Sequence, residues 1–311
     1  MGQCDFIWGP LLPAFKIFGA NQYFKTDKDL YKISQFCGIY TKVVLIFLLC
    51  QNIFLGIVAS PTIEGNELLS YTFGVVSIFG YGLSCITGNL DILVRNSALS
   101  HAINKIIFLK KELNRLRFTF LIKSKFFHWL FAIFLCEFFI DIILFLIYFF
   151  TLNFEDWGPR LMYIFMNKVI LSQEFSFLIY VYNVKILLEL INFGVVKICA
   201  TFNFDKLFQH RKKNYSKDLE NIRRLRMIYS STCEVSEIID KSFSNINLVN
   251  IALDFTGLVY SVHTNGINTK EKTLIEYGVI LYWFSFFLLK LVLKLKISSR
   301  TMFEVNMKML F

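Results

Sequence analysis

The amino-acid sequence predicts an all-α, polytopic membrane helical bundle, and two observations indicate it. Of the 311 residues, 55% are hydrophobic and 17% aromatic, whereas only 18% are charged, against about 25% in a typical soluble domain. The apolar residues also gather into six long stretches separated by polar segments. With 4 prolines and 15 glycines the chain is poor in turn-forming residues, so we expect one membrane domain over 1–311.

Six stretches are long and apolar enough to cross a bilayer, which takes about 20 residues. They are 38–60, 71–90, 126–150, 161–195, 246–262 and 273–295. The fourth, about 35 residues, would be about 52 Å long as a helix, which exceeds the hydrocarbon thickness of about 30 Å. We therefore expect it to project beyond the membrane, with cytoplasmic helical extensions over about 196–245 and 296–311.

Lysine and arginine collect in alternate connecting segments. The loops after the second and fourth stretches contain "FLKKELNRLR" and "FQHRKK", and the tail after the sixth contains Lys290, Lys294, Lys296, Arg300 and Lys308, whereas the loops near Glu64 and Glu155 are acidic or sparse. The positive-inside rule then places the N-terminus, both basic loops and the tail in the cytoplasm of a plasma-membrane protein. The basic runs are explained by topology and by contact with anionic membrane lipids, so we expect no nucleic-acid partner.

The sequence lacks the motifs of an enzyme. Its 4 histidines have no partner at metal-ligand spacing, and no P-loop, G-x-S-x-G or H-E-x-x-H pattern occurs. The 7 cysteines also lack such spacing, and none falls in a predicted outward loop, so reduced thiols are expected. We therefore expect no enzymatic activity, no metal and no cofactor.

Ionisable residues interrupt three of the apolar stretches. Glu137 and Asp141 lie one helical turn apart in the third, Lys168 and Glu174 lie in the fourth, and Asp254 lies in the fifth. Each costs about 2.5–3.5 kcal/mol in a membrane, so all should face the bundle interior or water.

Two interpretations of these charges remain open: a polar, water-accessible ligand pocket in which Lys168 pairs with Asp141 or Asp254, and interhelical pairs that only fix packing. Aromatic residues in the outer halves of the same stretches favour a small-molecule pocket. The candidate ligand-binding residues are Tyr71, Glu137, Asp141, Tyr148, Tyr163, Lys168, Glu174, Asp254, Tyr260, Tyr277 and Trp283.

The segment before the fifth stretch carries a helical apolar stripe. Its members are Ile222, Leu225, Tyr229, Val235, Ile239 and Phe243, and the opposite face is charged. Neither Gly nor Pro separates the stripe from the fifth stretch, so 218–262 is predicted to form one continuous helix. Its first half should pack into a helical anchor domain below the membrane.

The run "LENIRRLRMIYSSTCEVSEIIDKSFSNINLVNIALDFTGLVY" resembles the insect gustatory receptors, a family of seven-span chemosensory proteins with an intracellular N-terminus. Members have a leucine- and arginine-bearing helix here, then an Asn–Phe–Ser-like element and a span ending near a tyrosine. Leu225, Arg226, Tyr229, Phe243, Ser244 and Tyr260 match that pattern, and "LLPAFKIFGANQYF" resembles the family's opening segment.

The resemblance implies a tastant-gated, nonselective cation channel that assembles as a homo- or heterotetramer. In that architecture the outer halves of the early spans enclose the tastant. Cytoplasmic helix extensions form the anchor, and the seventh span lines the pore. An odorant receptor of the same superfamily is the nearest alternative. A G-protein-coupled receptor and a transporter using Glu137, Asp141, Lys168 and Asp254 as an ion relay are more distant ones.

The sequence departs from the family at its end. The family's Thr-Tyr…Gln-Phe signature in the seventh span is absent, and the chain stops at "ISSRTMFEVNMKMLF". We expect an incomplete gene product rather than a divergent form that cannot conduct alone. The apolar stripe of the fifth helix would then lack a partner, be partly exposed and leave the product unstable.

Overall fold

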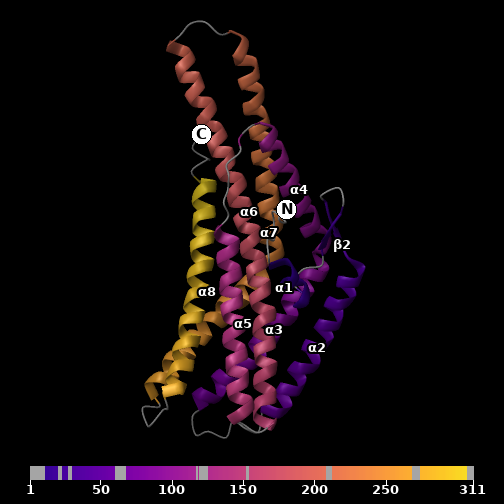
Figure 1. The fold of residues 1–311 in the computed structure, drawn as a ribbon, viewed down its shortest axis with the longest axis vertical. Coiled ribbons are helices and arrows are strands. Elements are labelled where there is room, and N and C mark those ends of the chain that lie inside the picture. Colours follow the sequence, from indigo (N-terminus) through magenta and orange to yellow (C-terminus); the bar gives the residue numbers. More distant parts are fainter. Residues whose placement is uncertain are drawn as a thin grey trace.

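The computed structural model describes residues 11–19, 23–26, 30–59, 68–116, 118, 125–151, 154–207, 212–267 and 274–306 (Figure 1). Over these residues the chain forms eight helices and one short strand pair. The helices are α1 (Leu12–Ile17), α2 (Gln35–Ala59), α3 (Leu68–Val94), α4 (Asn96–Arg115), α5 (Lys125–Thr151), α6 (Phe154–Leu207), α7 (Lys212–Ile267) and α8 (Leu274–Asn306). The strands β1 (Tyr23–Lys25) and β2 (Tyr31–Ile33) pair antiparallel with Tyr23 opposite Ile33. The all-α prediction is confirmed apart from this pair.

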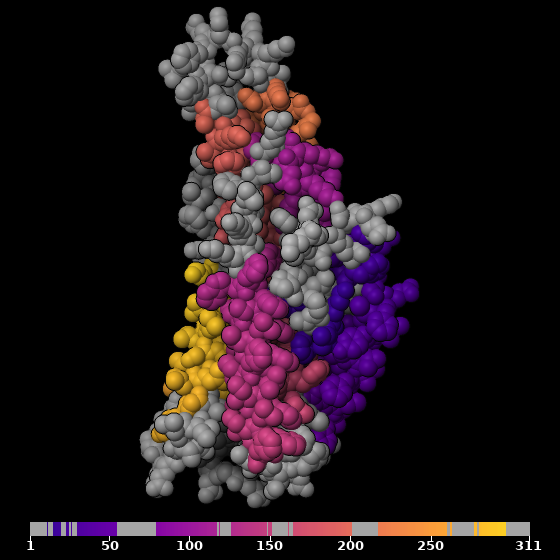
Figure 2. Space-filling view, in the orientation of Figure 1, coloured from indigo at the N-terminus to yellow at the C-terminus, as the bar shows by residue number. Residues whose placement is uncertain are grey.

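Large apolar side chains are exposed along α2, α5, the second half of α7 and α8. They include Ile39, Val43 and Ile53 on α2, Trp129, Phe139 and Ile143 on α5, Leu248, Phe255 and Val262 on α7, and Leu281, Val292 and Leu295 on α8. Figure 2 shows α5 lying at the surface between α8 and α2. Such a belt is unfavourable in water and favourable in hydrocarbon.

Within the residues that the structure describes, three segments are long and apolar enough to cross a membrane: Gln35–Phe54, Phe126–Ile147 and Ile164–Ala200. They coincide with the first, third and fourth predicted spans and indicate a membrane protein. The other three predicted spans lie within α3, α7 and α8. Their crossing of the membrane stays a prediction.

Helices α6 and α7 are much longer than a bilayer requires, with 54 and 56 residues. They lie side by side and project past α2, α5 and α8 at one end of the molecule, where α4 packs beside them (Figure 1). The predictions of an overlong fourth helix and of one continuous helix through 218–262 are confirmed. Residues 208–211 and 307–311 of the predicted extensions lie outside the part of the chain that the structure describes.

Helix α4 occupies the segment that the sequence presented as a basic loop. A single residue, Arg95, separates it from α3, and backbone hydrogen bonds continue across the break, from Arg95 N to Asp91 O and from Leu99 N to Arg95 O. One face of α4 buries Leu99, Ile103, Ile106 and Leu113 among other residues. This spacing is amphipathic rather than uniformly apolar, so a search for spans passes over it.

The apolar stripe of α7 is covered by α4 and α6 of the same chain. Leu225, Val235, Ile239 and Phe243 are buried and Tyr229 is partly buried, whereas Ile222 is 40% exposed. The expectation that a missing partner would expose this stripe is therefore wrong for its buried members, because α4 takes part in covering it.

Candidate functional site

The first cluster of buried charges joins α5 to α6. The Lys168 ammonium lies 2.5 Å from Asp141 Oδ2 and 3.8 Å from Glu137 Oε2. The two carboxylates face α6 together because residues four apart lie on the same side of a helix. From α8, the Tyr282 hydroxyl donates a hydrogen bond of 2.5 Å to Glu137 Oε2. Of the two partners predicted for Lys168, the structure provides Asp141.

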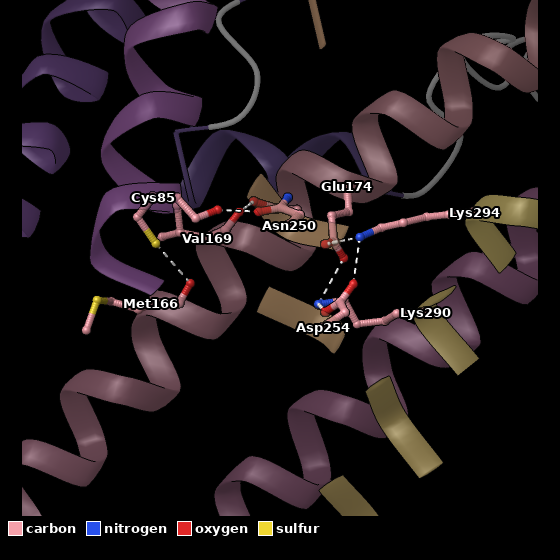
Figure 3. Close-up of polar contacts among 10 residues, drawn as sticks. Cys85, Met166, Val169, Glu174, Asn250, Asp254, Lys290 and Lys294 are labelled. Carbon is pink, nitrogen blue, oxygen red and sulfur yellow. Dashed lines mark hydrogen bonds and ion pairs between the residues drawn. The ribbon is translucent and has the colours of Figure 1, made fainter. Parts of the chain in front are cut away.

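The second cluster is a closed ring of two lysines and two carboxylates (Figure 3). Lys290 Nζ lies 3.2 Å from Glu174 Oε2 and 2.7 Å from Asp254 Oδ1. Lys294 Nζ lies 2.6 Å from Glu174 Oε1 and 2.7 Å from Asp254 Oδ2. All four side chains are at least 94% buried. The ring thus ties α8 to α6 and α7 with no net charge.

Sequence reasoning missed half of this ring, because it assigned Lys290 and Lys294 to a cytoplasmic tail. The structure places both inside the bundle, so they are not loop charges of the kind that the positive-inside rule counts. A signal was present in "LLKLVLKLK": two lysines four residues apart share one helix face. Glu174 and Asp254 are the carboxylates in the neighbouring apolar stretches that needed a basic partner, and matching them to these lysines would have predicted the ring.

A cavity of about 240 Å³ lies beside the first cluster. Its walls are almost entirely apolar: Phe138, Ile142 and Phe145 come from α5, Leu161, Ile164 and Phe165 from α6, and Phe18 follows α1. Asp141 and Lys168 also line it. Phe18 packs against Phe134 and Phe165 with ring centroids 6.1 and 6.2 Å away, so the N-terminal segment forms part of the wall.

The mouth of this cavity faces the exposed belt, since Phe138, Ile142 and Leu161 are all exposed at the surface. A small apolar molecule dissolved in a membrane could reach it between α5 and α6. The aromatic walls suit a compact apolar or aromatic ligand, and the buried ion pair supplies the polar groups nearest to it.

Among the remaining predicted ligand residues whose side chains the structure describes, Trp283 and Tyr277 do not line this cavity. Trp283 is partly buried on α8 and stacks on Phe287 with ring centroids 5.8 Å apart. Tyr277 is 46% exposed. The side chains of Tyr71, Tyr148, Tyr163 and Tyr260 lie outside the part that the structure describes.

A layer of uncharged polar side chains lies next to the ion clusters. The Ser84 hydroxyl of α3 donates to Asn250 Oδ1 of α7, and Cys85 Sγ donates to Met166 O at 3.3 Å (Figure 3). On α6, the amides of Asn167 and Gln173 are fully buried, and no hydrogen-bond partner for them is found in the described part of the chain. Buried amides of this kind are typically satisfied by internal water.

The described residues contain no group of three or more His, Cys, Asp or Glu side chains that could hold a metal ion. The charged groups of the bundle instead contact one another, which is an arrangement for holding helices together or for responding to a change of charge.

Comparison with known proteins adds no relative: no protein-family model matches the sequence, and no curated protein matches it.

Proposed function

We propose that the chain is a subunit of a chemosensory receptor of the insect gustatory-receptor type, a tastant-gated, nonselective cation channel of the plasma membrane. The observation that carries the proposal is the division of the molecule into two parts. A bundle with an exposed apolar belt continues into a body of α4, α6 and α7, whose outward face on α7 bears charged residues such as Arg223 and Lys241. The family resemblance implies such an anchor below the membrane, with the N-terminus in the cytoplasm.

The proposal requires six spans, and the second ion cluster supports them. Asp254, Lys290 and Lys294 lower the apolar character of α7 and α8. Because they neutralise one another together with Glu174, the charges do not have to face lipid. The apolar side chains Leu248, Phe255 and Leu281 on the outer faces of these helices are then free to contact acyl chains.

The tastant is proposed to bind in the cavity between α5 and α6. Its apolar walls favour a compact apolar ligand over a sugar, because a sugar would lose hydrogen bonds to water that these walls cannot replace. This wall chemistry also fits an odorant receptor of the same superfamily.

The test is to express the chain in cells, alone and together with other chemoreceptor subunits, and to record cation currents evoked by bitter, odorant and sugar panels. An Ile164→Trp substitution should fill the cavity and abolish responses to apolar ligands. Val292→Trp on the exposed face of α8 serves as the control, and it should leave them intact. Absence of any evoked current in every combination would reject the proposal.

A second candidate is an ion- or proton-coupled transporter, which the two buried ion clusters favour specifically. The two candidates differ in what the substrate does. A transporter accumulates radiolabelled substrate in reconstituted vesicles in proportion to an imposed proton gradient, whereas a channel passes cations in response to a ligand that is not itself transported.

A further inference from the structure

Among the side chains that the structure describes on α5 to α8, the buried charges do not balance. Along the described lengths of α5 to α8, four carboxylates are buried, Glu137, Asp141, Glu174 and Asp254, against three lysines, Lys168, Lys290 and Lys294. The fourth buried lysine, Lys110, is on α4 and hydrogen-bonds Asn183 of α6. Asn183 lies nine residues beyond Glu174, or about 13 Å along the helix.

The excess negative charge can be assigned to one residue from the distances. Asp141, Glu174 and Asp254 each have a lysine ammonium within 2.7 Å. The cation nearest to Glu137 is Lys168 at 3.8 Å, and Lys168 is already at 2.5 Å from Asp141. The closest contact of Glu137 is instead the neutral Tyr282 hydroxyl.

The groups that face Glu137 act in opposite directions. Asp141, one turn along α5, repels a negative charge on Glu137, while Lys168 from α6 and Lys290 from α8 attract one. Lys290, however, is held by Asp254 and Glu174. A buried carboxylate without its own counter-ion takes up a proton rather than remain charged.

We propose that Glu137 is a proton-binding site, a neutral carboxylic acid while Tyr282 of α8 is hydrogen-bonded to it. Tyr282 and Lys168 both contact Oε2 of Glu137, and this atom, as the carbonyl oxygen of the acid, can still accept from Tyr282 with the proton on Oε1. On ionisation the O–H bond of the acid breaks, the proton passes to water, and the carboxylate competes with Asp141 for Lys168. The first cluster therefore rearranges when Glu137 loses its proton. This proposal does not depend on the receptor assignment.

The test compares amide substitutions, which keep shape and remove charge, in the full chain purified in detergent. Glu137→Gln should leave the melting temperature unchanged within a few degrees. The matched controls Glu174→Gln and Asp254→Asn each leave two buried lysines with a single carboxylate between them and should lower it by roughly 5–8 °C. If Glu137→Gln lowers the melting temperature as much as the controls do, Glu137 is charged in the fold and the proposal is overturned.

Infrared spectroscopy gives a second, direct readout at neutral pH. The wild-type chain should show the carbonyl stretch of a protonated carboxylic acid, shifted in D₂O, and Glu137→Gln should lose that band while Tyr282→Phe shifts it. Absence of the band would overturn the proposal. A bound metal cation is the alternative way to balance the charge of Glu137. In that case the wild-type melting temperature would be higher in sodium chloride than in choline chloride at equal ionic strength, and Glu137→Gln would show no such difference. That result would also overturn the proposal.

Discussion

Lys290 and Lys294 lie one turn apart on α8, and their ammonium groups share the same two carboxylates, those of Glu174 and Asp254. The sequence has no Asp or Glu within one helical turn of either lysine on α8. The four charges are therefore all paired only when α6, α7 and α8 are packed together, so the stability of the ring depends on the placement of all three helices.

Removing one lysine from the ring should be costly. Lys294→Met leaves two buried carboxylates with a single cation, and breaking such a network costs about 3–5 kcal/mol. Lys296→Met, at an exposed position two residues away, should change stability by less than about 0.5 kcal/mol. The measurement is chemical unfolding in detergent, followed by Trp fluorescence.

A compensating change sharpens that comparison. Adding Asp254→Asn to Lys294→Met restores charge neutrality, so the double variant should lose less stability than the sum of the two single losses. Additive losses would show that the four groups do not act as a ring.

Gly257 of α7 is expected to set the distance between α7 and α8. A Cβ atom at this position would lie 2.6 Å from Cε2 of the Phe287 ring, which is buried, so the ring or the helix has to shift. Gly257→Ala should therefore cost about 1–3 kcal/mol through overpacking. Gly278→Ala on α8 meets no atom within 4 Å and should instead stabilise by about 0.5–1 kcal/mol, since alanine favours the helix. Equal effects in thermal unfolding of the two variants would contradict the close approach.

Lys110 should make stability depend on pH. Burial lowers its pKa from 10.5 to about 7. Between these values the unfolded chain binds more protons than the folded chain, so stability should rise with pH from about 7 toward 10.5 and stay level below 7. At its steepest, the contribution of Lys110 raises the free energy of unfolding by about 1.4 kcal/mol per pH unit.

The measurement is unfolding free energy against pH for the wild type and for Lys110→Met, which lacks the titrating group. The Met variant should lose this rise, and the difference between the two curves isolates Lys110 from other titrating groups. Parallel curves across this window would show that Lys110 keeps its charge in the fold.

Thiol labelling should separate the membrane-facing surface from the aqueous one. Cys50 of α2 and Cys136 of α5 are exposed on the apolar belt, whereas Cys199 is exposed on α6 beyond the predicted fourth span. Thiols react as thiolates, which need water. In single-cysteine variants, an impermeant maleimide should label Cys199 only after permeabilisation and should spare Cys50 and Cys136. Labelling of Cys199 on intact cells would reverse the proposed orientation.

The long helices could be predicted because their signals are local and strong. The apolar runs of α2, α5 and α6 follow directly from composition, and the continuity of α7 follows from the absence of Gly or Pro before its apolar half. Helix α4 was missed because its buried residues Ile103, Ile106 and Leu113 are spaced among lysines. Mean hydropathy averages the apolar and polar faces of a helix together, so this segment has the low value of a polar segment.

The candidate site, too, could be predicted only in part from the sequence. Glu137, Asp141, Lys168, Glu174 and Asp254 are conspicuous because a charge in an apolar run is expensive. Which lysine meets which carboxylate depends on the rotation and depth of each helix, and these are fixed only by packing. Lys290 and Lys294 resemble the flanking charges of a span end, and Tyr282 resembles an interfacial aromatic, until α8 is placed against α5 and α6.

Helix α6 runs as one continuous helix along the length of the molecule. It is about 80 Å long, and along it lie the cavity wall at Phe165, the ring carboxylate Glu174, the Lys110 partner Asn183 and Gly194, which abuts Leu225 of α7. No proline interrupts it between these points. Under the proposed function, a molecule bound between α5 and α6 near Phe165 would tilt α6 about the ion clusters, and a tilt of about 5° over its length would shift its far end by several ångströms. We therefore expect binding at one end of α6 to be transmitted to the other end through the whole helix rather than through local side-chain shifts.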